Sequence, residues 1–260
     1  MSSAATRRRF AWATVICVLV AIAGMTGSSR TGALYSSEAT SAMRVSTPEQ
    51  CTRDGAPYDP YSAAVGTLNP TWRWTFGSAE DGTLIDSGRT GNALPVVGEG
   101  LSKATSDVTC GEDGALAVAA GSLGGVTGAL GDVDQVTVLS WVHASSPGRL
   151  LTLVGPSCTL AVDVGEDGVF TLGDGVSTVR SVARAGEVTL LGVVFTDGGA
   201  RLVVADGASA HVPCPGPVSA LTVGSYDGAA AAGARFSDVA AVPQSVDVDE
   251  VRRLVAANSW

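Results

Sequence analysis

The sequence predicts an all-β fold: an antiparallel β-sandwich of the jelly-roll type, with one short C-terminal helix and an N-terminal hydrophobic leader helix. Three observations lead to this prediction. The 260 residues include 33 glycines, and 45% are apolar, mostly Ala and Val, with only 5% aromatic. From Trp72 onward, short apolar runs alternate with turns rich in Gly and Asp, as consecutive hairpins require. A helical pattern occurs only at the end of the chain, and a long apolar run only near its start.

The first 33 residues are typical of an export leader. Arg7–Arg9 precede an apolar run of 16 residues, Phe10 to Met25, which is intermediate between a signal-peptide core and a membrane span of roughly 20 residues. Two interpretations stay open. The leader is either a signal peptide cleaved after Ala33 or an uncleaved membrane anchor with its arginines on the inner side. Both export residues 40–260.

Residues 34–70 are expected to form a linker or extended arm, followed by a sandwich domain over residues 71–260. The arm contains four prolines among many Ser and Thr residues, and proline interrupts both helices and sheets. We expect it to be fixed near Cys51.

The charge of the exported part excludes one class of partner. The chain has a net charge of −9, and its first 33 residues hold four Arg and no acid, which leaves 12 basic and 25 acidic residues, or −13, in the remainder. Such a surface repels phosphate backbones, so we expect no nucleic-acid partner.

Four cysteines follow the leader, an even number that predicts two disulfides in an oxidising compartment. They are Cys51, Cys110, Cys158 and Cys214. Three pairings satisfy this count. We favour Cys51–Cys110 with Cys158–Cys214, because each bond then joins two segments of the same half of the chain. No C-x-x-C motif supports zinc.

Nine apolar runs in the second half of the chain are predicted as strands. The first of them is apolar on both faces, as expected for a central strand, and Gly- and Asp-rich turns such as GEDG and TDGG separate later ones. The runs cover residues 135–143, 149–154, 158–164, 169–172, 176–182, 188–195, 200–206, 219–226 and 234–242.

The C-terminal segment after residue 245 predicts the helix. Asp247 and Glu250 have the spacing of a capping box, and acidic residues in the first turn suit the helix dipole. Val248, Val251, Leu254 and Val255 form one apolar stripe.

Taken in order, these segments resemble a bacterial laminin G-like domain of the concanavalin A-like lectin/glucanase superfamily, over residues 71–257. The resemblance is carried by an aromatic pair, a loop, a central strand, a hairpin and a closing strand with its helix. These are `WRWTF` from Trp72, `DSGRTGNAL` at 86–94, `VTVLSWV` at 136–142, the segment 190–207 and the segment 234–256.

The resemblance implies two kinds of site. Trp72 and Trp74 lie two apart in a strand and point to one face, with Arg73 on the other. The indoles either fill the space between the sheets or form a sugar-stacking platform. The family often holds a calcium ion at its rim, for which Asp132, Asp134 and Asp227 are candidates by residue type.

We expect no catalysis. The superfamily's glucanases carry paired carboxylates in a Glu-x-Asp-x-x-Glu strand, and no such strand occurs; the nearest match, at 247–250, is explained by helix capping. The two histidines, His143 and His211, lie far from any G-x-S-x-G elbow.

The resulting hypothesis is an exported, non-catalytic module of a Gram-positive cell surface that binds carbohydrate or a surface protein. One alternative is a structural or accessory subunit of a surface fibre or biofilm matrix. It is suggested by `TGALYSSEATS` at 31–41, which resembles signal peptides cut by a specialised signal peptidase of surface and matrix proteins. A degenerate glycoside hydrolase is a further alternative.

Overall fold

A computed structural model describes the greater part of the chain after residue 51. The chain divides into two compact units, Met1–Thr47 and Pro48–Trp260, and all of the described residues belong to the second. The leader, Cys51, Cys110 and the loop at 86–92 lie outside the described residues. Those residues are 52–53, 56–57, 59–76, 84–85, 93–94, 96–97, 99–105, 114–119, 124–176, 178–184, 188–196, 198–204, 207–225 and 230–257.

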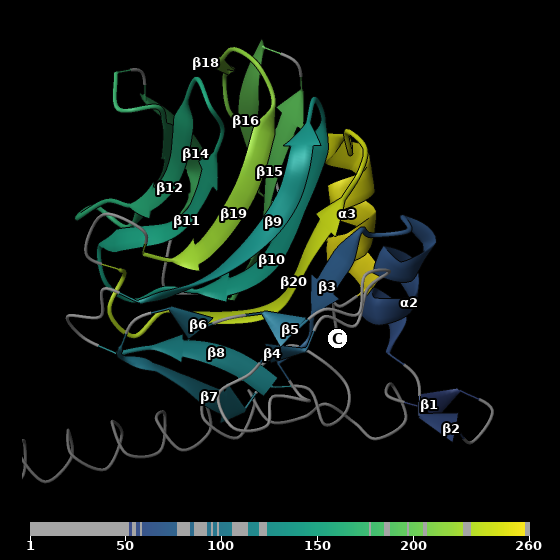
Figure 1. Cartoon of the computed structure of the whole chain (residues 1–260). Coiled ribbons are helices and arrows are strands. Elements are labelled where there is room, and N and C mark those ends of the chain that lie inside the picture. The colour runs from purple at the N-terminus through teal and green to yellow at the C-terminus, as the bar shows by residue number, and fades with distance from the viewer. Residues whose placement is uncertain are drawn as a thin grey trace, which may run out of the picture. The chain divides into compact units, whose positions relative to one another are not determined.

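Two antiparallel sheets form the β-sandwich that the sequence predicts, and both sheets are curved (Figure 1). The first has nine strands in the order β17-β16-β15-β10-β20-β8-β7, with β18 also paired to β16 and β3 also paired to β20. Its strands are β3 (Trp72–Trp74), β7 (Leu101–Thr105), β8 (Gly114–Val118), β10 (Val136–His143), β15 (Thr189–Thr196), β16 (Gly198–Val204), β17 (Gly207–Ala208), β18 (Val212–Cys214) and β20 (Arg235–Val242).

The second sheet has seven strands in the order β14-β13-β12-β11-β19-β9-β6. Two short pairs, β1 (Thr52–Arg53) with β2 (Ala56–Pro57) and β4 (Leu84–Ile85) with β5 (Ala93–Leu94), lie outside both sheets. The strands of the second sheet are β6 (Val96–Val97), β9 (Gly125–Val133), β11 (Gly148–Val154), β12 (Thr159–Val164), β13 (Val169–Gly173), β14 (Thr178–Arg184) and β19 (Val218–Gly224).

Alternation along the strands places one apolar face of each sheet in a shared core. In β12 and β13 every second residue is buried, so that Leu160, Val162, Phe170 and Leu172 point inward. All nine runs predicted as strands from the sequence are strands, with ends that differ by one or two residues.

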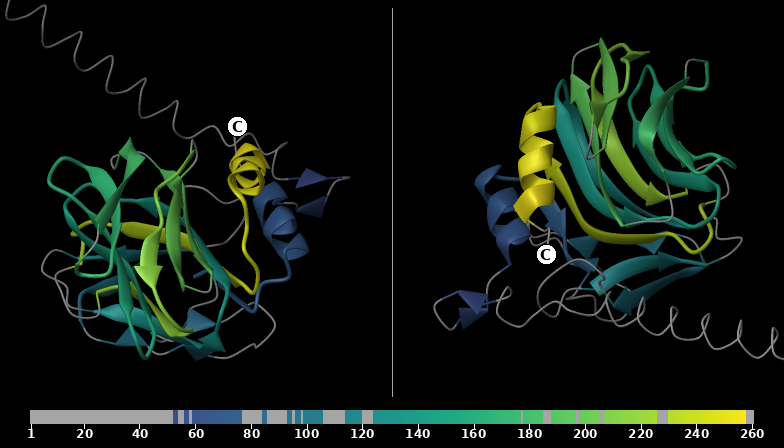
Figure 2. Two further views of the ribbon diagram at one scale, coloured as in Figure 1. Left: turned by 90° about the horizontal axis from the view of Figure 1, so that it is seen from above. Right: turned by 180° about the vertical axis from the view of Figure 1, so that it is seen from behind.

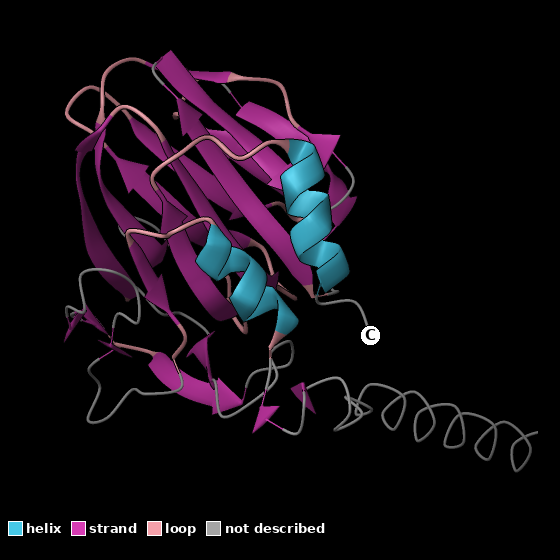
Figure 3. Cartoon of the chain, turned by 90° about the vertical axis from the view of Figure 1, so that its right-hand side faces the viewer, coloured by secondary structure: helices cyan, strands magenta, loops and turns pink. Residues whose placement is uncertain are grey.

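A second apolar cluster forms on the outer face of the nine-stranded sheet, where two helices cover it (Figures 2 and 3). Helix α3 (Val248–Ala257) buries Val251 and Leu254, and the backbone N–H of Glu250 donates to Asp247 Oδ1 at 2.7 Å. The predicted cap and apolar stripe are therefore confirmed.

Helix α2 (Pro60–Thr67) corrects the sequence analysis, which placed an extended arm there. Asp59 caps it by accepting the Ser62 N–H at 3.0 Å, and Pro60 occupies its first turn, where proline is tolerated because its missing N–H would be unpaired anyway. Tyr61 is fully buried and packs edge-on against Trp141, with ring centroids 5.6 Å apart. Proline content alone hid this helix, because an Asp-Pro pair also marks a helix start. In the described part of the chain, no helix has the length and apolarity needed to cross a membrane.

The Tyr61 hydroxyl gives a prediction for alkaline pH. It is buried without a hydrogen-bond partner, and burial, followed by the charge of Asp238, raises the pKa of Tyr61 well above its ordinary value. The unfolded chain loses this proton near pH 10, whereas the folded chain retains it. We therefore expect full stability below about pH 10 and, above it, a fall of up to about 1.4 kcal/mol per pH unit from this group.

Replacing Tyr61 with phenylalanine is expected to remove the part of the stability loss above about pH 10 that comes from the Tyr61 hydroxyl. At pH 7 the variant should be as stable as the wild type or slightly more stable, because an unpaired buried hydroxyl is removed. Urea unfolding between pH 8 and pH 11 measures both. Parallel pH profiles for the two proteins would contradict a buried, protonated Tyr61.

Candidate functional site

The two tryptophans belong to the core, which excludes a sugar-stacking platform. Trp72 and Trp74 are 2% and 0% exposed, and their rings stack at 4.3 Å between centroids with 13° between planes. They lie against β9 of the opposite sheet, where a Cβ on Gly128 would be 2.8 Å from Trp74 Cζ2. Neither indole has a face open to a ligand, so of the two interpretations the filling of the space between the sheets is correct.

Arg73, between the tryptophans, points to the outer face as expected and joins β3, β20 and α2. Its Nε donates to Asp238 Oδ1 at 2.7 Å, a second guanidinium nitrogen bonds to Asp238 Oδ2, and it also reaches Ser62. Burial alone would lower the pKa of Arg73, but the hydrogen bond and charge of Asp238 raise it above its ordinary value. This is an anchor for α2 rather than a ligand site.

The predicted calcium ligands do not form a cluster in the described part of the chain. Asp132 is exposed near the end of β9, and Asp134 is exposed just after it. Asp227 lies outside the described residues. Among the described side chains there is no group of three or more His, Cys, Asp or Glu placed to hold a metal ion. Calcium binding stays a prediction.

A disulfide joins Cys158 to Cys214, with 5.6 Å between the Cα atoms. Cys158 precedes β12 in the seven-stranded sheet, and Cys214 ends β18 in the nine-stranded sheet. The bond therefore fixes β18 to the opposite layer. Cys51 and Cys110, the other predicted pair, lie outside the described residues.

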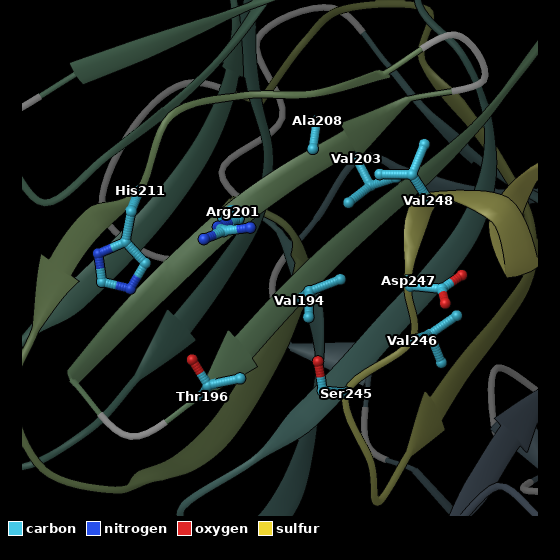
Figure 4. Close-up of a pocket in the computed structure, with 10 residues that line it drawn as sticks. All are labelled: Val194, Thr196, Arg201, Val203, Ala208, His211, Ser245, Val246, Asp247 and Val248. Atoms are coloured by element: carbon cyan, nitrogen blue, oxygen red, sulfur yellow. The ribbon is translucent and has the colours of Figure 1, made fainter.

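The candidate site is a cavity of about 370 Å³ on the outer face of the nine-stranded sheet, beside the start of α3 (Figure 4). This volume lies in the range of small-molecule sites, roughly 300–1,000 Å³. We call the cavity the β15–α3 hollow. It is lined by Val194, Thr196, Arg201, Val203, Ala208, His211, Ser245, Val246, Asp247 and Val248.

Strand register places four of the ten lining residues. Val194 and Thr196 alternate along β15, and Arg201 and Val203 alternate along β16, so both pairs face outward. Val194 pairs directly with Arg201 across the two strands. The sheet thus contributes two valine side chains, with a guanidinium and a hydroxyl beside them.

The segment between β20 and α3 forms the facing wall and is held by one buried hydroxyl. Thr137 Oγ1 donates to the Gln244 carbonyl at 2.7 Å and accepts the Val246 N–H at 3.0 Å. Thr137 is fully buried, so this link is shielded from water. Ser245 and Asp247 are thereby fixed on either side of Val246.

The lining of the β15–α3 hollow suits a polyhydroxylated ligand. Val194, Val203 and Val246 are buried, so Ala208 and Val248 are the apolar lining groups that can contact C–H groups. The hydroxyls, Arg201, His211 and Asp247 can exchange hydrogen bonds with ligand hydroxyls. Asp247 is the only carboxylate among the lining residues within the described part of the chain, and it already caps α3.

No sequence pattern predicted this site. His211 was considered only for its distance from a G-x-S-x-G elbow, and Arg201 was only one position in a predicted strand. No local motif links them, because the β16–β18 pairing and the return of the chain to α3 bring the lining together. The strand alternation that exposes Arg201 and Val203 on one face was the one available signal.

A second polar surface lies on the outer face of the seven-stranded sheet, which neither described helix covers. Thr127, Thr222 and Thr152 are in register across three strands, and Arg149 forms an ion pair with Asp163 beside them. Thr152 and Thr222 are almost fully buried, so this surface presents fewer free polar groups than its composition suggests.

Solved structures similar to this chain share its β-sandwich fold. Domain 4 of AbnA, a GH43 extracellular arabinanase from Geobacillus stearothermophilus, in complex with arabinotriose, is 15% identical, with a TM-score of 0.55 over 72% of this chain and 98% of that one. Trypanosoma rangeli sialidase in complex with the inhibitor DANA is 13% identical, with a TM-score of 0.52 over 72% of this chain and 32% of that one.

The receptor-binding domain of botulinum neurotoxin type G is 12% identical, with a TM-score of 0.50 over 72% of this chain and 51% of that one. This chain thus spans about a third of the sialidase and half of the toxin domain. No family model and no curated protein sequence matches the chain. At these identities the similarity shows the β-sandwich fold alone, and membership of the laminin G-like group of the concanavalin A-like superfamily stays a prediction.

Proposed function

We propose that this chain is an exported, non-catalytic module that binds a short saccharide in the β15–α3 hollow. The observation that carries the proposal is the lining itself, in which the accessible apolar groups of Ala208 and Val248 stand beside hydroxyl, guanidinium, imidazole and carboxylate groups. Such a site can contact both the C–H and the O–H faces of a sugar ring. The fold is compatible with this function, since a domain of similar fold is known in complex with arabinotriose.

Among the described residues of the lining there is no second carboxylate, which supports a binding role over hydrolysis. Canonical glycoside hydrolysis requires two carboxyl groups that flank the scissile bond, and of the lining side chains that the structure describes only Asp247 carries one. Export is the part of the proposal that rests on the leader, with its Arg7–Arg9 cluster and apolar run.

The test is a glycan array followed by calorimetry with the full chain, exported and purified in its oxidised form. Measurements with calcium and with chelator show in addition whether the predicted calcium matters. We expect saturable binding to a defined glycan without its hydrolysis. Turnover of the bound glycan would contradict the non-catalytic role. Failure to bind any glycan would reject the proposal in favour of a structural subunit.

Two matched tryptophan variants locate the site. Ala208 lines the β15–α3 hollow and is exposed, so Ala208→Trp should fill the hollow and abolish binding. Ala129 is an exposed residue of β9, in the seven-stranded sheet, so Ala129→Trp should leave affinity unchanged. The reverse result would move the site to the seven-stranded sheet.

A further inference from the structure

Arg201 differs from the other arginines with described side chains in having no partner. Each of the others forms an ion pair with an acid or contacts a histidine, whereas Arg201 has no hydrogen bond or ion pair. The paired residues are Arg73–Asp238, Arg149–Asp163, Arg180–Asp167, Arg235–His143, Arg252–Asp249 and Arg253–Glu250. In a chain with 25 acidic residues and a net charge of −9, an exposed guanidinium that forms no ion pair with Asp247, the one carboxylate among the described lining residues, is an available anion-binding group.

The two ends of the β15–α3 hollow differ in charge. In Figure 4, Arg201 lies between His211 and Val194, and Asp247 lies on the far side of Val194. Asp247 accepts the Glu250 N–H, so it is engaged at the start of α3 rather than with Arg201. One end of the hollow therefore offers a cation and an imidazole, and the other offers an acceptor for hydroxyls.

His211 is placed beside Arg201 by a close approach to the backbone of β16. A Cβ on Gly199 would lie 2.3 Å from His211 Cε1 and 2.2 Å from the Val212 carbonyl oxygen, so only glycine allows the ring to rest there. The next three residues form β18, which pairs with β16 and ends in the disulfide of Cys214. The exposed imidazole thus lies beside Arg201 at the anion-binding end.

We propose that the β15–α3 hollow selects saccharides that carry a carboxylate, with Arg201 binding the carboxylate and the sugar ring lying against the exposed Ala208 and the partly exposed Val248. A guanidinium matches a carboxylate with two parallel hydrogen bonds, which a lysine cannot reproduce. The ring hydroxyls then reach Ser245 and Asp247 at the other end. This inference rests on the proposed function and names its ligand class.

The experiment compares oligosaccharides of galacturonate, glucuronate and sialate with their methyl esters, which keep the shape and remove the charge. For the ligand that binds, we expect esterification to weaken binding by about tenfold, a typical loss for a hydrogen bond to a charged group. Arg201→Gln should weaken binding of the acid by a similar factor and leave binding of the ester within about twofold. The affinity of Arg201→Lys for the acid should fall between those of the wild type and Arg201→Gln. Arg252→Gln removes an equal charge from exposed α3 and should change nothing.

The outcomes separate this inference from the proposed function. Glycan binding that Ala208→Trp abolishes, but that esterification and Arg201→Gln leave unchanged, would overturn the inference and keep the proposed function. Binding of sulfated but not carboxylated oligosaccharides would also overturn it. Absence of binding to every glycan would reject both.

Discussion

Replacing Trp74 with alanine is expected to lower the free energy of unfolding by about 3–5 kcal/mol, the usual cost of deleting a large buried aromatic side chain. Trp74 is fully buried, and its ring stacks on that of Trp72 at 4.3 Å. Loss of the indole removes the stack and leaves a cavity between the sheets, because Gly128 opposite has no side chain to fill it. Urea unfolding followed by circular dichroism measures the effect.

Two further variants keep this prediction testable if Trp74→Ala does not fold. Trp74→Phe should cost less, and it should bind any glycan ligand as the wild type does, because the indole has no face open to solvent. Val176 is 94% exposed, so Val176→Ala should stay within about 0.5 kcal/mol of the wild type. A loss below about 1 kcal/mol for Trp74→Ala would contradict the buried stack.

Replacing Asp238 with alanine is expected to cost about 3–5 kcal/mol as well, since it leaves a mostly buried guanidinium without its partner. The Asp238 side chain is 1% exposed and that of Arg73 is 13% exposed. Asp238 also has φ = 52° at the irregularity between β10 and β20, a conformation that alanine adopts less readily than Asp or Asn. Chemical unfolding of the variant provides the value.

A matched variant and a double mutant separate the two contributions to this loss of stability, the unpaired charge and the backbone conformation. Asp238→Asn keeps the tolerance for positive φ and one acceptor, so its loss should be smaller than that of alanine. Arg73→Met combined with Asp238→Ala should recover part of the loss, because no unpaired charge remains. Equal losses for the single and the double mutant would show that the ion pair is not the cause.

Nine strands were predicted from the sequence because each carries its own signal, whereas β7, β8, β9 and β18 were not among the predicted runs. Residues 188–195 and 200–206 are β-rich runs separated by TDGG, and they pair as β15 and β16. The closing helix was equally visible, because Asp247 and the apolar stripe are local features. In both cases the deciding contacts lie within a few residues of the pattern that predicts them.

Features that depend on distant residues were not predictable from the sequence. Helix α2 is held by Arg73 and Asp238, the second of which lies 165 residues beyond Arg73, and by the packing of Tyr61 on Trp141. The β15–α3 hollow likewise combines β15, β16, the segment before β18 and the start of α3. A periodic pattern shows which face of a strand is buried, but it does not show which other segment shares that face.

The placement of α2 and α3 also bears on how the protein can be handled. Helix α2 begins at Pro60 and α3 ends at Ala257, and both lie on the outer face of the nine-stranded sheet, next to each other (Figure 3). The β15–α3 hollow opens on that same face. A chip, bead or fusion partner attached close to either helix end therefore sits on the side where ligand enters. Affinities are better measured with untethered protein, or with a label on the seven-stranded sheet.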